Sequence, residues 1–116
     1  VEETEGQMDI VHARARAVIG RYYAKAKENE LAMQYYSGAL DMLSDQTDPH
    51  SAVEVAMLLG QVLSDAGRKE EAAEHYIDAM VLAEANDFRM LQGELLARLG
   101  EVESDRSQKM DYLQRS

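Results

Sequence analysis

The chain has 116 residues, 46% of them hydrophobic, and a formal net charge of −10 from 22 acidic and 12 basic residues. This length predicts one domain, and the hydrophobic share is too high for a disordered chain. The acidic balance argues against nucleic acid and anionic membranes as partners, because both would repel it. The absence of cysteine excludes disulfides and thiolate metal sites, and no apolar run approaches the roughly 20 residues that span a bilayer. We therefore expect a cytoplasmic protein.

The first predicted unit covers residues 8–47 and contains two helices. Helical spacing of apolar residues predicts one helix from about Met8 to Lys27 and another from about Glu30 to Leu43. Glu28 and Asn29 are expected to form the turn between them.

The second predicted unit covers residues 48–86. Asp48 is a good N-cap residue, and Pro49 fits the first position of a helix. Gly67 is expected to end that helix in a left-handed conformation, and a second helix should start near Lys69 and end at Asn86. Two apolar stripes are predicted to be buried: Val55, Ala56, Leu59, Val62 and Leu63 on the first helix, and Ala72, Tyr76, Ala79, Met80 and Ala83 on the second.

The third predicted unit covers residues 87–116. Asp87 is expected to cap a helix from about Phe88 to Asp105, and a short second helix is expected near Lys109 to Arg115. An ungapped alignment places Tyr112 opposite Ala72, whereas a four-residue deletion places it opposite Tyr76, and the sequence leaves both alignments open.

The units repeat every forty residues, most visibly at Gly20, Gly60 and Gly100. A glycine inside a helix costs about 1 kcal/mol relative to alanine, which is tolerable where a neighbouring helix must approach closely. We expect such a close approach at all three glycines. Tyr36 and Tyr76 are expected to fill the space beside them, with Ala32 and Ala72 also at helix contacts.

These features resemble the tetratricopeptide repeat (TPR) family over residues 13–105. The clearest copy is LLGQVLSDAGRKEEAAEHYIDAM, IGRYYAKAKENELAMQYYSGAL is a second, and LARLGEVESD starts a third. The period of forty exceeds the usual 34 and is similar to that of spindle-orientation adaptors, rapsyn-like scaffolds and bacterial TPR regulators. HEAT or armadillo repeats also fit this period, but their prolines and fixed Asp/Arg pattern are absent. The resemblance implies an all-α superhelix of antiparallel helix pairs, with about three repeats in one domain over residues 1–116 and the last repeat incomplete.

The resemblance also implies a non-catalytic scaffold whose first helices line a concave groove for a partner peptide or helix. Helical spacing then assigns these residues to the groove: Arg14, Ala17, Arg21, Lys25, Glu54, Met57, Gln61, Asp65, Glu94, Arg98, Glu101 and Asp105. The first helix is basic and the other two are mainly acidic, so a partner with an acidic end and a basic end is expected. Met57 is expected to offer an adaptable apolar contact. The simpler alternative for each charge is a solvated helix face.

The carboxylate clamp of chaperone-binding TPR proteins is not matched. Arg21 and Leu58 stand where that clamp has asparagines, and Arg98 alone agrees with its final arginine. A chaperone-tail cofactor is therefore not expected.

Nothing in the sequence indicates an enzyme, a cofactor or a metal site. The three histidines are scattered, and His75 is interpreted as a solvated surface residue. No nucleophile motif and no phosphate-binding glycine loop occur. The alternative to a scaffold is a self-associating or packing segment of a larger TPR protein, in which open terminal repeats form a homo-oligomer.

Overall fold

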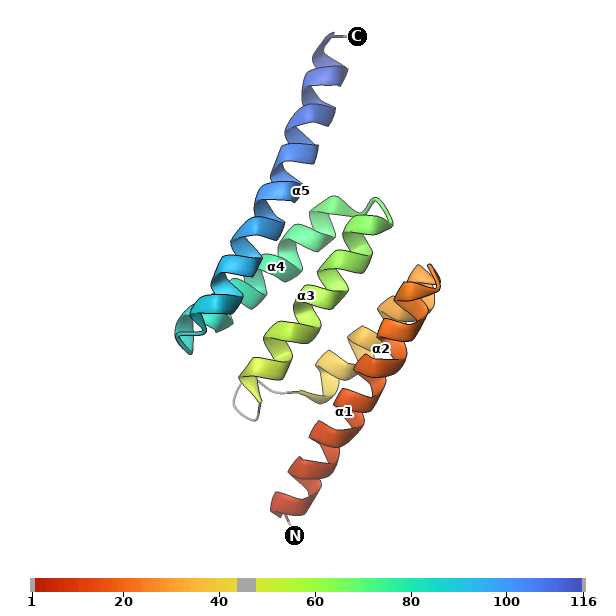
Figure 1. The fold of residues 1–116 in the computed structure, drawn as a ribbon, viewed down its shortest axis with the longest axis vertical. Coiled ribbons are helices and arrows are strands. Elements are labelled where there is room, and N and C mark those ends of the chain that lie inside the picture. The colour runs from red at the N-terminus through yellow and green to blue at the C-terminus, as the bar shows by residue number, and fades with distance from the viewer. Residues whose placement is uncertain (1, 44–47, 116) are drawn as a thin grey trace.

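Within the described residues, the computed structural model has five helices and no strand (Figure 1). The helices are α1 (Glu2–Lys25), α2 (Asn29–Met42), α3 (Pro49–Asp65), α4 (Lys69–Ala85) and α5 (Arg89–Arg115). The structure describes the backbone of residues 2–43 and 48–115, and the side chains of residues 11–43 and 48–103. The predicted all-α class is confirmed.

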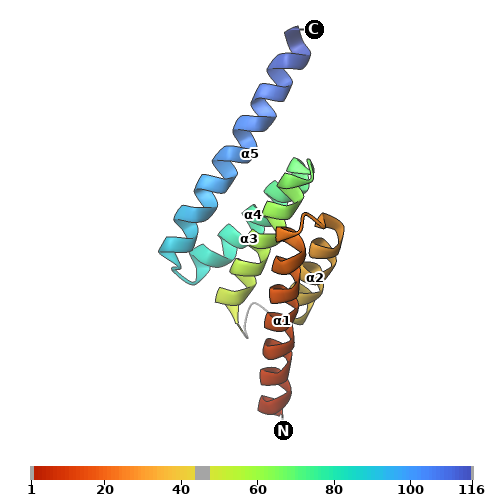
Figure 2. The ribbon, with the colours of Figure 1, turned by 45° about the vertical axis from the view of Figure 1, so that its right-hand side comes forward.

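The helices stack in chain order, and each one packs against the next. In Figure 1, α1, α3 and α5 form one layer, and α2 and α4 lie behind them; the turned view in Figure 2 shows the same succession. The molecule is elongated, with principal extents of 62 × 32 × 17 Å. The first helices of the predicted units therefore share one face, as a groove between them would require.

Three helices end in the same type of backbone turn, in which a residue of positive φ follows the helix. This residue is Lys27 after α1 (φ 62°), Gly67 after α3 (φ 84°) and Asp87 after α4 (φ 57°). In each turn the residue of positive φ donates its N–H three residues back, and the next residue donates five residues back. This is the Schellman pattern, which satisfies carbonyl groups at a helix end. The prediction for Gly67 is confirmed. The prediction for Asp87 is wrong, because Asp87 closes α4 instead of capping α5. The first turn covers residues 26–28, so the predicted turn is right at Glu28 and wrong at Asn29, which begins α2.

The predicted cap of α3 is confirmed. The Asp48 carboxylate accepts the backbone N–H of Ser51 at 3.2 Å and the Ser51 hydroxyl at 2.6 Å, and Pro49 follows it at the start of the helix. Burial alone would raise the pKa of Asp48, but the hydrogen bonds from Ser51 and the nearby Arg14 outweigh it, so the pKa lies below its usual value.

We expect Asp48→Ala to lower the free energy of unfolding at pH 7 by about 1 kcal/mol, since α3 loses its N-terminal cap. The folded-state pKa is depressed, so this stabilisation is complete above the unfolded pKa of about 4 and disappears as the pH falls through the folded value. Urea unfolding of both proteins at pH 7 and pH 3 checks this. Asp41→Ala, at an exposed site on α2, serves as the control; a difference that stays constant with pH would contradict the assignment.

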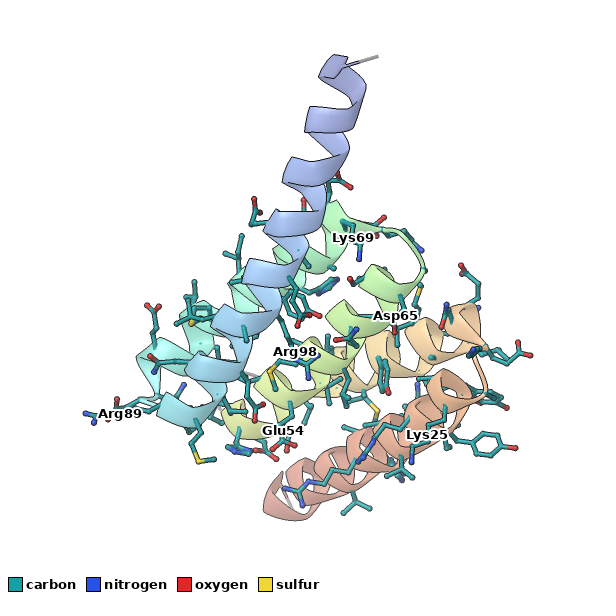
Figure 3. All side chains as sticks on the ribbon, turned by 45° about the horizontal axis from the view of Figure 1, so that its top comes forward. Lys25, Glu54, Asp65, Lys69, Arg89 and Arg98 are labelled. Carbon is teal, nitrogen blue, oxygen red and sulfur yellow. The ribbon has the colours of Figure 1, made fainter. Side chains whose placement is uncertain are left out.

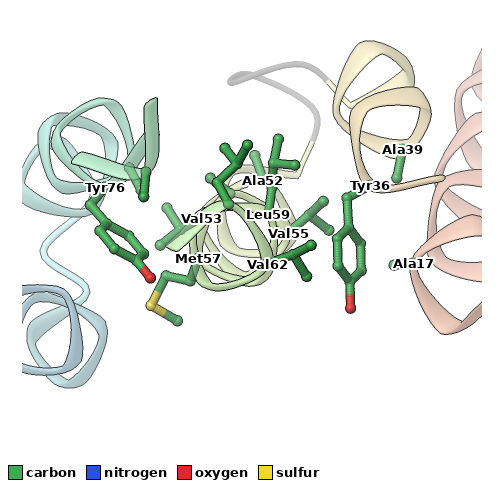
Figure 4. Close-up of a cluster of buried hydrophobic side chains, with 14 of the residues drawn as sticks. Ala17, Tyr36, Ala39, Ala52, Val53, Val55, Met57, Leu59, Val62 and Tyr76 are labelled. Atoms are coloured by element: carbon green, nitrogen blue, oxygen red, sulfur yellow. The ribbon is translucent and has the colours of Figure 1, made fainter. Parts of the chain in front are cut away.

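Two buried tyrosines organise the core. Tyr36 and Tyr76 are each 1% exposed. Figure 4 shows Tyr36 between α3 and α1, and Tyr76 on the opposite side of α3, beside Val53 and Met57. Each ring thus contacts the two helices that flank its own, which joins three successive helices at one point. The stripes predicted for α3 and α4 are confirmed as buried, except that Met80 is half-buried.

The repeated glycines differ in their surroundings. A Cβ at Gly20 would lie 2.8 Å from the ring of Tyr36, and one at Gly60 would lie 2.5 Å from that of Tyr76. The predicted close approach is confirmed at these two sites. It is wrong at Gly100, where a Cβ would meet nothing within 4 Å. The reason is that α5 continues unbroken to Arg115, so the short second helix predicted near Lys109 does not fold back over it. The alternative pairings of Tyr112 lie outside the described side chains.

Candidate functional site

A groove of about 300 Å³ lies between α1 and α3. We call it the α1/α3 groove, and its lining is Arg14, Ala17, Val18, Arg21, Leu43, His50, Ser51, Glu54, Val55 and Leu58. Four residues that the sequence assigned to a binding groove line it together: Arg14, Ala17, Arg21 and Glu54. The helical spacing on α1 and the stacking of α1 beside α3 explain this convergence.

The α1 wall of the groove is basic. Arg14 Nη2 lies 3.3 Å from Asp48 Oδ2, so part of its charge is balanced by the cap of α3. Arg21 is exposed and forms no ion pair with another described residue. Burial raises the pKa of the Tyr36 hydroxyl, and the positive charge of Arg21 opposes this rise. Arg21 therefore presents an available guanidinium group, which suits a carboxylate ligand.

The α3 wall carries an acid beside a histidine. Glu54 Oε1 lies 2.9 Å from His50 Nδ1, one helical turn apart, and both side chains are about half exposed. The His50 ring also packs edge-on against Phe88 at 5.2 Å between centroids. Val18 and Leu58 add apolar surface to the lining. The groove thus offers positive charge, negative charge and an apolar floor to one bound segment.

Further along the layer, three predicted groove residues are bonded to each other. Arg98 donates to Gln61 Oε1, and Gln61 Nε2 donates to Asp65 Oδ1 at 3.0 Å. Figure 3 shows Arg98 on the side of α5 that faces α3. Burial raises the pKa of Tyr76, and a hydrogen bond from Arg98 opposes this rise. This chain of polar contacts ties α5 to α3 and leaves Arg98 less available to a ligand than Arg21.

The remaining predicted residues lie apart from the α1/α3 groove. Lys25, Glu94 and Glu101 are exposed on the first-helix layer. Met57 is 7% exposed and belongs to the core, so the expected adaptable contact on the surface is wrong. Its side chain packs near Tyr76 instead of facing solvent (Figure 4). The side chain of Asp105 lies outside the described residues.

A larger hollow of about 630 Å³ lies on the opposite layer, between α2 and α4 with α3 as its floor. Its lining is mostly apolar: Leu40, Ala52, Ala56, His75, Asp78, Ala79, Val81, Leu82 and Ala85. No pattern in the sequence led us to expect this hollow. Of its lining residues, Val81 is an apolar side chain that is 65% exposed on α4. His75, interpreted from sequence as solvated, is half-buried beside this hollow.

The sequence matches no protein-family model and no curated protein. Across the described part of the chain, no helix has the length and apolar character needed to cross a membrane. Within the same residues, no three His, Asp or Glu side chains are grouped so that they could hold a metal ion.

Proposed function

We propose that this chain is a TPR-like, non-catalytic scaffold that binds a segment of a partner protein in the α1/α3 groove. The observation that carries the proposal is the convergence of Arg14, Arg21 and Glu54 from two helices on one groove. The repeated contact of a helix glycine with a buried tyrosine supports the TPR-like stacking. The cysteine-free composition fits a cytoplasmic location, which belongs to the same proposal.

The chemistry of the groove defines the partner segment. An Asp or Glu side chain would pair with Arg21, where a guanidinium can donate two parallel hydrogen bonds. A Lys or Arg side chain would lie near Glu54, and a small apolar residue between them would contact Val18 and Leu58. Charges arranged in this way select the partner and speed its association more than they raise affinity.

A charge reversal tests the groove. Peptides selected against the chain from a displayed random library should carry an acidic residue next to an apolar one. Arg21→Glu should weaken their binding about 10-fold, because an attraction becomes a repulsion, and added salt should weaken binding to the native chain. Fluorescence anisotropy of a labelled selected peptide measures both effects.

Arg89→Glu is the matched control for this test. Arg89 is also an exposed arginine, but it lies at the start of α5 and bonds to Asp87 outside the groove. Equal loss in the two variants would show a general charge effect, and no loss in Arg21→Glu would refute the groove assignment.

Self-association is the second candidate, and the surroundings of Gly100 favour it. Among the described side chains, none covers Gly100 as Tyr76 covers Gly60, and Leu96 on the same helix is 63% exposed. A second copy could cover this side of α5. Analytical ultracentrifugation over a wide concentration range tests self-association, because a monomer at every concentration would exclude it.

A further inference from the structure

The forty-residue period assigns one face of each first helix to the helix that precedes it. On α3 this face consists of Ser51, Val55, Leu58 and Val62. On α5 it consists of Leu91, Leu95, Arg98 and Val102. The same positions on α1 are Val11, Ala15, Val18 and Tyr22, which we call the open face of α1.

Burial at these positions differs sharply between the helices. On α3, Val55 is 5% exposed and Val62 is 3% exposed. On α5, Leu95 and Val102 are 0% and 2% exposed. On α1, by contrast, Val11, Val18 and Tyr22 are 59%, 64% and 70% exposed. Val11 and Tyr22, whose equivalents Leu91, Val62 and Val102 are buried, therefore lie at the surface of α1. Val18 lies beside them, and its equivalents Leu58 and Arg98 are half-buried.

The helices that cover α3 and α5 indicate which kind of element fits the open face of α1. α2 packs on α3 and α4 packs on α5, and each is a helix that runs antiparallel to the first helix beside it (Figure 1). The open face of α1 has the same apolar spacing along one side of a helix. A single antiparallel helix is thus the element that continues the existing packing.

The charge of α1 further restricts which helices can bind its open face. Residues 11–27 contain five basic residues and no acidic one, in a chain whose net charge is −10. The covering helix α4 has five acidic residues and one lysine, and two of the acids, Glu70 and Glu71, lie in its first turn. A helix lying antiparallel on α1 would place an acidic first turn near Lys25 at the end of α1, which is electrostatically favourable.

We propose that the open face of α1 docks an acidic amphipathic helix of a partner protein, in the manner in which α4 covers α5. The site borders the α1/α3 groove at Val18, which lines both, but Val11 and Tyr22 do not line that groove, and the proposal goes beyond the function proposed above. The bound helix contributes apolar residues to Val11, Val18 and Tyr22, and carboxylates to the surrounding basic side chains. It adds one helix to the stack.

The probe is a labelled synthetic peptide with the sequence of α4, Lys69–Ala85, titrated with the full chain at low salt. We expect saturable binding, followed by fluorescence anisotropy, that weakens at least 10-fold in the double variant Val11→Asp/Tyr22→Asp. A peptide with its acids changed to Gln and Asn should also bind less tightly. No saturable binding to the native chain, or equal binding to the double variant, would overturn the proposal.

Two controls keep the result specific. Val81→Asp introduces the same charge at an equally exposed valine on α4, and it should leave peptide binding unchanged. Tyr22→Trp gives a single fluorescent reporter, since the chain has no tryptophan, and its emission should shift to the blue when the peptide covers it. An unshifted spectrum at saturating peptide would place the peptide elsewhere and reject the proposal.

The competing occupant is an anionic membrane, because a basic helix with an apolar stripe also suits a lipid surface. Sedimentation with phosphatidylserine vesicles separates the two. Vesicle binding by the native chain that is lost in the double variant would assign the face to lipid and overturn the proposal. Peptide binding without vesicle binding supports it. The groove is tested independently, because the Arg21→Glu experiment uses a different residue and a different peptide.

Discussion

Tyr76→Ala should lower the free energy of unfolding by about 3–5 kcal/mol, the range for removing a buried aromatic ring. Tyr76 is 1% exposed, and its ring touches the backbone side of α3 at Gly60 while it also lies next to Arg98 of α5. Its removal opens a cavity at a junction of three helices. Urea unfolding followed by circular dichroism measures the loss, and the variant is expected to be marginally folded at best.

The control for this prediction is Tyr22→Ala. The Tyr22 ring is 70% exposed and contacts Tyr23 edge-on at 5.5 Å between centroids. Its loss should change stability by less than about 0.5 kcal/mol, as for most surface substitutions. Similar losses in both variants would contradict the role of Tyr76 at the junction of three helices.

Alanine at Gly60 and alanine at Gly100 should have opposite effects. At Gly60 the new methyl group would lie 2.5–2.9 Å from three ring atoms of Tyr76, and overpacking of this kind costs about 1–3 kcal/mol. The better helix propensity of alanine offsets about 1 kcal/mol of this cost, so we expect a net loss of up to about 2 kcal/mol. At Gly100 a Cβ meets nothing, so Gly100→Ala should stabilise the protein by up to about 1 kcal/mol.

A double-mutant cycle identifies the cause of the loss at Gly60. In the background of Tyr76→Leu the ring is absent, and Gly60→Ala should then cost less than it does in the native chain. Gly93→Ala provides a second open site that should behave like Gly100→Ala. A stabilising effect at Gly60 equal to that at Gly100 would show that the ring does not restrict this position.

Much of the helical architecture could be predicted because local signals and tertiary packing agree. Asp48 followed by Pro49 marks the start of α3, and Gly67 marks its end, each for a reason that acts within a few residues. The pairing of Gly60 with Tyr76 could also be predicted, since the same pair of residue types recurs forty residues earlier. The TPR family itself remains a prediction.

The repeat alone could not predict that α5 continues as one helix from Arg89 to Arg115 without a turn. The position equivalent to Gly67 is Ser107, and no glycine or proline lies near it to end the helix. Lys27 shows that a non-glycine residue can adopt the left-handed turn, at a cost of roughly 1–2 kcal/mol. That cost is offset after Lys27 because α2 brings a buried Ala32 and Tyr36 to α1. No alanine and tyrosine follow Ser107 at the same spacing, so a turn there gains no comparable packing.

The candidate groove was predictable in part. Spacing placed Arg14 and Arg21 on one face of α1, and the stacking of α1 beside α3 brought Glu54 to them. Spacing could not reveal that Arg98 would bond to Gln61, because such a contact depends on how two distant helices sit side by side. Spacing also could not show that Met57 is buried, because Tyr76, which lies beside it, comes from another helix.

The stacking of each helix mainly on its immediate neighbours has a consequence for how the chain opens. Stability in such a row is close to a sum of local terms, so a helix at either end can detach while the middle stays folded. α3 has packed neighbours on both sides, whereas α1 and α5 each lie at an end of the row. Unravelling should therefore proceed inward toward α3. Because the contacts are local in sequence, refolding needs little loop closure and should be fast.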